Sequence, residues 1–199
     1  MFAPASKAAF TVGAFVAPNE QYPQNSSSLL REAPRGAYVT VGTERGFISA
    51  GIAARIDLLV LTDIDLAVVQ FNRINIALLK VAGSRENYVS LRLEAPSSKW
   101  ALAAKDPLMT PEERKLLRNP DAWKWWVESV RGREGKNALF FESFHRPPSA
   151  AGVDEAFHSA NYLFYDDQFA RVSGMAKADR IHVLPVDYRD LRQIEKISK

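Results

Sequence analysis

The chain has 199 residues, 47% of them hydrophobic and 25% charged, which suits one globular domain able to bury a core. It contains no cysteine, which excludes disulfides, thiolate metal sites and a cysteine nucleophile, and the spacing of its three histidines gives no support for a metal. The formal net charge of +3 is scattered and no apolar run reaches the ~18 residues of a membrane span, so neither nucleic acid nor a membrane is expected as a partner.

Residues 1–37 precede the first expected strand. The first 18 residues are rich in small side chains, but their single lysine comes too late for the basic region of a signal peptide. We therefore expect a cytoplasmic protein, with secretion as the alternative. Residues 19–28 are polar and turn-rich. They predict either a surface connector or, through Glu20, Tyr22 and Asn25, part of an N-terminal flap formed by residues 1–37.

Residues 38–95 show the order of a βαβα half. Strands are predicted over Tyr38–Val41 and Ile56–Leu61, the first followed by a glycine turn and a short helix, the second by acidic residues. The apolar periodicity of Leu66–Val81 predicts a helix. Residues 86–95 fit a helix or a strand, and we favour the helix. This order is typical of a doubly wound α/β sheet, which binds ligands at the carboxyl ends of its strands.

Residues 96–160 are predicted to form a helical insertion. Thr110-Pro111-Glu112-Glu113 is a capping box with proline at the first helical position. A second helix is expected after Asn119, and its three tryptophans, at 123, 125 and 126, cannot share one helical face. They either roof a core or contact a substrate, a protein or, in a third hypothesis, a nucleic acid. Residues 137–144 are compatible with a strand.

Residues 161–199 are predicted to form a third helix–strand unit. An amphipathic helix is expected over Asn161–Ala178, and an apolar strand follows from Arg180 to an acid at Asp187. A glycine turn thus follows the first predicted strand, and an acidic residue stands at the end of the second and of the third.

This arrangement favours an adenosine-containing ligand. Glycines in the first turn let the backbone approach the ligand closely. Asp63 can accept hydrogen bonds from both ribose hydroxyls, and Ile64 beside it can pack on adenine. Asp187 can accept a bond from the adenine amino group, and Tyr188 can form an aromatic wall.

Three segments resemble the first three motifs of class I S-adenosylmethionine-dependent methyltransferases: VTVGTERGF, VLTDIDLAVVQFNRINIALL and RIHVLPVDYRDL. They cover about a third of the chain. In the second segment, Asp63, Ile64, Asp65 and Asn75 follow the pattern of the family. The resemblance implies a single Rossmann-like domain that binds S-adenosylmethionine and methylates an unknown small-molecule or protein acceptor. The implied cofactor-binding residues are Gly42, Thr43, Glu44, Gly46, Asp63, Ile64, Asp187 and Tyr188.

The sequence also departs from that family. Thr40 stands where the family has an acid, and Glu44 stands where it has its middle glycine. Glu44 can replace the missing acid by turning toward the amino group of the donor, or its presence means that the pocket no longer binds the donor. The 96–160 insertion can form a substrate lid. No C-terminal fourth strand is recognisable, which predicts truncation, rearranged topology or a degenerate domain.

Two alternatives concern the ligand and the activity. The first is a non-catalytic methyltransferase-like binding or accessory domain. The second, a nicotinamide dinucleotide cofactor, is disfavoured because Glu44 would repel its pyrophosphate.

Catalytic residues stay unassigned at this stage. Methyl transfer from a sulfonium donor depends on alignment more than on acid–base chemistry. Candidates for an optional general base are His145, Tyr22, Tyr165 and Asp166, and we expect each to be a structural or surface residue instead.

Overall fold

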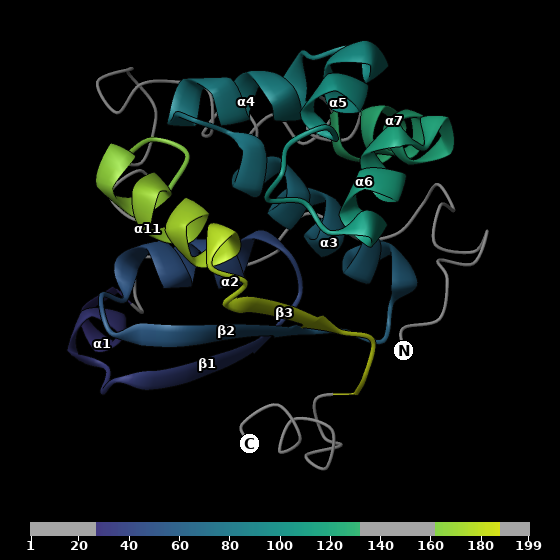
Figure 1. The fold of residues 1–199 in the computed structure, drawn as a ribbon. Helices are drawn as coiled ribbons and strands as arrows, with labels where there is room; N and C mark the ends of the chain where they lie inside the picture. The colour runs from purple at the N-terminus through teal and green to yellow at the C-terminus, as the bar shows by residue number, and fades with distance from the viewer. Residues whose placement is uncertain (1–26, 132–161, 188–199) are drawn as a thin grey trace, which may run out of the picture.

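The computed structural model describes residues 27–131 and 162–187, which form a mixed α/β fold, as the sequence predicts (Figure 1). The predicted strand at 137–144 lies outside these residues. In chain order, the helices and strands are α1 (Ser27–Glu32), β1 (Gly36–Val41), α2 (Glu44–Ile52), β2 (Ile56–Thr62), α3 (Leu66–Val81), α4 (Arg85–Leu93), α5 (Ser97–Ala103), α6 (Pro111–Arg118), α7 (Pro120–Trp126), the π-helix η3 (Val127–Arg131), α11 (Asp166–Lys177) and β3 (Ile181–Leu184).

The three strands form a parallel sheet in the order β1-β2-β3. Val41 pairs with Thr62, and Thr62 pairs with Leu184, so the strands end level with one another. Figure 1 shows helices α2–α7 and α11 on one side of this sheet, with α2 and α11 nearest to it and α4–α7 farther away, and it shows α1 beside the left end of the strands. The carboxyl ends of the strands therefore meet at one edge.

Helix α3 is the centre of the core. It has the predicted bounds, and Asp65 caps it by accepting a 2.8 Å hydrogen bond from the Ala67 amide. Nearly all of its side chains are buried, because it packs against α11, α4, α6 and β3. A helix apolar around most of its circumference is stable only in such an interior position.

The helical layer over α3 follows local capping signals. The residues with ambiguous periodicity, 86–95, lie mostly in helix α4, as favoured, and Ser84 caps this helix by accepting a bond from the Asn87 amide. Both hydrogen bonds of the predicted capping box are present at α6, between Thr110 and Glu113. No helix within residues 27–131 and 162–187 is long and apolar enough to cross a membrane.

The tryptophans of α7 belong to the core. Trp125 and Trp126 are buried, and the ring of Trp126 stacks on Phe71 with 5.2 Å between centroids. Trp123 is half-buried and donates its indole N–H to the Ala95 carbonyl at 3.2 Å. The contacts of these rings with the core confirm the interpretation that they roof it.

Two predicted boundaries differ from the structure. The helix expected from residue 161 begins at Asp166, where two aspartates occupy the first turn and complement the helix dipole. Residues 162–164 form a turn instead. The third strand ends at Leu184 rather than continuing to Asp187, because Pro185 has no N–H to extend the ladder.

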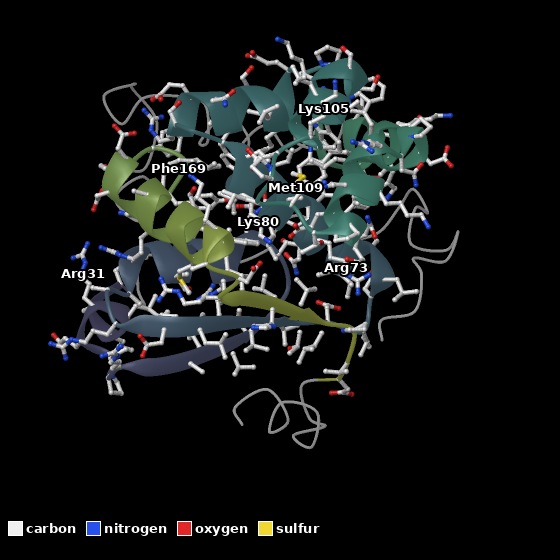
Figure 2. All side chains as sticks on the ribbon, viewed as in Figure 1. Arg31, Arg73, Lys80, Lys105, Met109 and Phe169 are labelled. Carbon is white, nitrogen blue, oxygen red and sulfur yellow. The ribbon has the colours of Figure 1, made fainter. Side chains whose placement is uncertain are left out.

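The opposite face of the sheet has a different environment. Tyr38 packs against the core on the helical side, whereas Val39 and Val41, which point the other way, are 40% and 45% exposed. A small second cluster on this face consists of Val60, Leu184 and Val186. Figure 2 shows strand side chains projecting from it. The described helices thus cover only one face.

Candidate functional site

The turn after β1 depends on Gly42. Its φ is +95°, a conformation that side-chain-bearing residues rarely adopt, and an added Cβ would meet no atom of residues 27–131 and 162–187 within 4 Å. The carbonyl of Gly42 accepts a 2.9 Å hydrogen bond from the Asn72 side chain of α3. The turn is therefore held by the core helix, and no described residue blocks the position of its missing side chain.

Gly46 lies deeper than Gly42, inside α2. An added Cβ would lie 2.4 Å from Leu61 Cδ2 and 2.8 Å from Thr40 Cγ2. Gly46 therefore lets α2 pack closely on β1 and β2. This packing requirement accounts for the glycine without a ligand, so its predicted role in binding stays a prediction.

Asp63 follows β2 directly at the carboxyl edge. Its amide donates to the Leu184 carbonyl at 3.2 Å, which joins it to the end of β3. Its side-chain Oδ1 accepts a 2.9 Å bond from the Asp65 amide, so the carboxylate is oriented by a local turn. Ile64 is 72% exposed. A half-buried carboxylate beside an exposed apolar side chain is compatible with a ribose and an adenine, respectively.

Asp187 lies three residues beyond β3. It is half-buried, and the preceding Val186 packs with Val60 and Leu184 on the face opposite the helices. Figure 1 shows the chain leaving β3 toward that face. Gly42, Asp63 and Asp187 are thus brought to one edge of the sheet, with Asp187 toward the face opposite the described helices. Tyr188 lies outside the described residues.

Thr43 and Glu44 point inward at the start of α2. Thr43 is 4% exposed and Glu44 is 1% exposed. Oε1 of Glu44 lies 2.6 Å from Nη1 of Arg92 on α4, and Oε2 accepts a 3.0 Å bond from the Tyr162 hydroxyl. Both carboxylate oxygens of Glu44 are therefore engaged inside the protein.

Five side chains make up the buried polar network around Glu44: Glu44, Asn75, Tyr88, Arg92 and Tyr162. The two tyrosine hydroxyls lie 3.1 Å apart, and the Tyr88 hydroxyl also bonds to the Asn75 carbonyl oxygen. The guanidinium of Arg92 lies over the rings of Phe71 and Trp126, at 5.5 and 5.8 Å from their centroids. The network ties α2, α3 and α4 to the segment before α11.

The network shifts the titration of its tyrosines. Burial, which disfavours the charged phenolate, raises the pKa of Tyr88 to about 12. Burial and then the negative charge of Glu44 raise the pKa of Tyr162 well above 10. Both hydroxyls are therefore neutral at physiological pH and act as hydrogen-bond donors and acceptors.

Sequence reasoning missed most of this network. Asn72 and Asn75 were visible as polar residues inside an apolar helix, but nothing local distinguished Arg92 or Tyr88 from other surface-type residues of an amphipathic segment. Asn72 is fully buried, and its Oδ1 has no hydrogen-bond partner within residues 27–131 and 162–187. Its side chain lies behind the Gly42 turn, whose carbonyl accepts a hydrogen bond from its Nδ2.

Two of the candidate general bases lie in the described part of the chain, and neither is placed at the carboxyl edge of the sheet by a contact. Tyr165 is half-buried and immediately precedes α11, and the Asp166 carboxylate is exposed and pairs with Arg85 at 2.7 Å. Tyr22 and His145 lie outside the described residues.

Residues 15–199 match the model of a family described as a domain of unknown function, DUF7790. The match spans most of the chain, so the chain belongs to this family. No curated protein matches the sequence. The family description states no activity, so a function has to be argued from the geometry of the edge of the sheet.

Proposed function

We propose that the chain is a Rossmann-like domain that binds S-adenosylmethionine at the carboxyl edge of the sheet and methylates an as yet unidentified acceptor. The observation that carries this proposal is the placement of Gly42 and Asp63 at the level ends of adjacent parallel strands. Ligands of doubly wound sheets bind at this edge. The strand order also supports the proposal, because each parallel connection moves the chain one strand in the same direction, as in one half of such a sheet.

The chemistry of the edge suits the donor. The Asp63 carboxylate is a pure acceptor and matches a pair of ribose hydroxyls, and Ile64 offers an exposed apolar surface to adenine. Methyl transfer breaks the sulfur–methyl bond, the sulfur keeps the electron pair, and the acceptor atom forms the new bond and loses a proton where it carried one. The protein mainly has to align these groups.

Glu44 does not serve the donor in this proposal. Its carboxylate is already engaged by Arg92 and Tyr162, and removing it from them would leave the guanidinium buried without its charge partner. The amino group of the donor then needs another acceptor.

The engagement of Glu44 by Arg92 and Tyr162 also favours a second candidate, a methyltransferase-like binding or accessory domain without catalysis. In this candidate, Glu44 stabilises the core instead of binding the donor. Both candidates have the same proposed adenosyl site, and they differ in whether the protein catalyses methyl transfer.

Calorimetric titration with S-adenosylmethionine tests the shared site. We expect saturable heat for the wild type, at least tenfold weaker binding for Asp63→Asn and Asp63→Ala, and no change for Asp121→Ala, which removes an exposed carboxylate on α7. The Asp63→Asn variant keeps an acceptor for the Asp65 amide, so a folding defect is separated from the loss of charge. Absence of heat with the wild type would remove both candidates.

Transfer of label from the methyl-labelled donor separates the two candidates. Incorporation into a cell extract that depends on Asp63 supports the enzyme. Donor binding without any incorporation supports the binding domain.

A further inference from the structure

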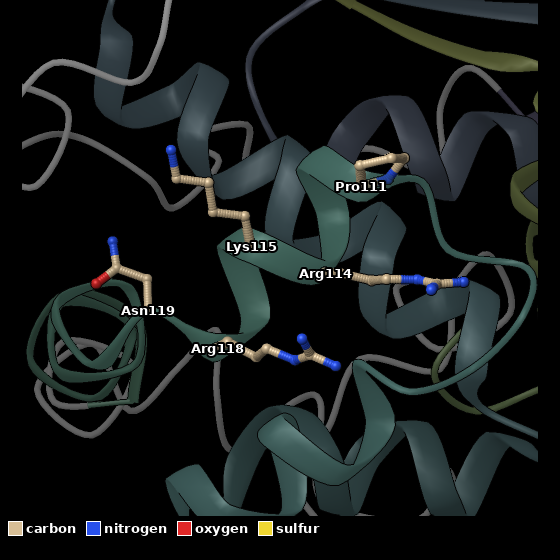
Figure 3. Close-up of a pocket in the computed structure, with 5 residues that line it drawn as sticks. All are labelled: Pro111, Arg114, Lys115, Arg118 and Asn119. Carbon is tan, nitrogen blue, oxygen red and sulfur yellow. The ribbon is translucent and has the colours of Figure 1, made fainter.

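Helix α6 borders an open pocket that is distinct from the edge of the sheet. The pocket has a volume of about 620 Å³ and is lined by Pro111, Arg114, Lys115, Arg118 and Asn119 (Figure 3). This volume falls within the ~300–1,000 Å³ typical of small-molecule sites. Three of the five lining residues are cationic, and none is acidic.

Helical spacing places two of the three cations on one face of α6. Arg114 and Arg118 are four residues apart and lie on adjacent turns, whereas the side chain of Lys115 extends away from both of them (Figure 3). Figure 3 shows Arg114 and Arg118 extending in the same direction from α6. Like charges at these spacings repel each other, so an anion between them would relieve an unfavourable interaction.

The positive charge of this cluster is not neutralised by the described residues. Lys115 and Arg118 are exposed, and neither has a carboxylate within ion-pair distance among residues 27–131 and 162–187. The neighbouring Glu113 is already committed to Lys80 at 2.8 Å and to the Thr110 amide.

Arg114 is held in place and only partly satisfied. Its Nη2 donates to the Asp106 carbonyl at 3.2 Å. Its Nε is buried and has no acceptor within the described part of the chain. A guanidinium fixed by main-chain carbonyls at one edge presents its remaining donors in a constant direction, which is the preorganisation that anion recognition requires.

We propose that the α6 pocket binds a small ligand that carries a phosphate group. A phosphate bears a charge of ~−1.5 to −2 at neutral pH and three acceptor oxygens, which match the two guanidinium groups of Arg114 and Arg118. The cations are confined to one eight-residue helix of a chain with a net charge of only +3, which suits a single phosphate rather than the extended backbone of a nucleic acid. This proposal is independent of the methyl-donor site.

Titration with ribose 5-phosphate tests the proposal, since this probe lacks adenine and does not report on the edge of the sheet. We expect saturable binding with a dissociation constant below ~1 mM. The Lys115→Gln/Arg118→Gln variant removes two exposed cations and should weaken binding at least tenfold. The matched control, Arg31→Gln/Arg55→Gln, loses the same charge from exposed positions on α1 and before β2 and should bind as the wild type does.

Parallel titrations identify the source of the phosphate. Equal affinity for inorganic phosphate means that the free anion is the ligand, whereas tighter binding of ribose 5-phosphate means that the pocket also recognises the attached group. No binding of either probe by the wild type would overturn the proposal. It would also fail if both double variants lost affinity equally, or if only a single-stranded oligonucleotide bound, because the effect would then be one of diffuse charge.

Discussion

Glu44 at the start of α2 and Arg92 near the end of α4 form an ion pair with side chains only 2% exposed and 2.6 Å between Oε1 and Nη1. The two residues are 48 positions apart in the chain. Their contact joins the helix that follows the Gly42 turn to the outer helical layer. The position of this turn therefore depends on packing far from the sheet.

Replacing Arg92 by methionine should destabilise the protein by about 3–5 kcal/mol, because it leaves the Glu44 carboxylate buried without its cation. The double variant Glu44→Gln/Arg92→Met should be more stable than Arg92→Met alone, since the unpaired charge is removed. Urea unfolding measures both. In the exposed Arg35–Asp57 pair, which solvent screens, Arg35→Met should change stability much less than Arg92→Met does. Equal losses at Arg92 and Arg35 would contradict a special role for the buried pair.

Two helical glycines should respond to alanine with opposite signs. Gly46→Ala should cost about 1–3 kcal/mol, because its Cβ would overlap Leu61 and Thr40 in a filled core. Gly174→Ala on α11 has open space around the added methyl and should stabilise the protein by about 0.5–1 kcal/mol. Thermal unfolding of the two variants provides the comparison. Stabilisation by Gly46→Ala would show that α2 does not lie this close to the sheet.

Tyr88 should be among the last tyrosines to ionise when the folded protein is made alkaline. Its pKa is raised from 10.0 to about 12, so between these values the native state retains a proton that the unfolded state has lost. Stability from this group is complete below the unfolded pKa and falls as pH rises toward about 12, by up to about 1.4 kcal/mol per pH unit. The ultraviolet absorbance of tyrosinate should show a late component in the native protein that Tyr88→Phe reduces. A single transition near that of the urea-unfolded chain would refute the buried network.

Lys80 connects α3 to α6 and to the residue two positions after α11. Burial lowers its pKa, but hydrogen bonds from its ammonium to Asp179 and Glu113 outweigh this and raise the pKa above its ordinary value. The side chain, labelled in Figure 2, is only 3% exposed, and its partners lie at 2.5 Å (Asp179) and 2.8 Å (Glu113). Lys80→Met should therefore cost about 1.5–3 kcal/mol.

The two partners of Lys80 should contribute unequally. Glu113→Gln keeps the capping box of α6 and removes a carboxylate that is 16% exposed, whereas Asp179→Asn removes one that is 72% exposed and well solvated. Unfolding measurements should give the larger loss for Glu113→Gln. The reverse order would mean that the contact of Lys80 with Asp179 contributes more to stability than its contact with Glu113.

The helices and strands were predictable where neighbouring residues carry the signal. Leu66–Val81 shows its apolar periodicity within the segment itself, and the Thr110 capping box needs only residues three positions apart. Helix and strand boundaries that depend on contacts between residues distant in sequence were harder to predict. Tyr162, which was expected inside the helix, lies in a turn before α11, and its hydroxyl bonds to Glu44, a residue 118 positions earlier.

The candidate site was predictable only in part. The edge of the sheet that gathers Gly42, Asp63 and Asp187 follows from parallel strands, and parallel strands follow from alternating strand and helix segments. The inward turn of Glu44 does not follow from its local sequence. A carboxylate after a glycine turn resembles an exposed residue at the start of a helix. Only the packing of α4 shows that Arg92 lies beside this carboxylate and pairs with it.

The pairing of β2 with β3 spans more than half of the chain, since Leu59 lies beside Ile181. Closing so large a loop is slow relative to forming helices whose contacts are close in sequence. A nascent chain carrying α2–α7 therefore holds Gly42 and Asp63 long before Asp187 has been synthesised. Translation order alone leaves this edge of the sheet incomplete until the last strand docks, so the proposed ligand site is among the last parts of the fold to form.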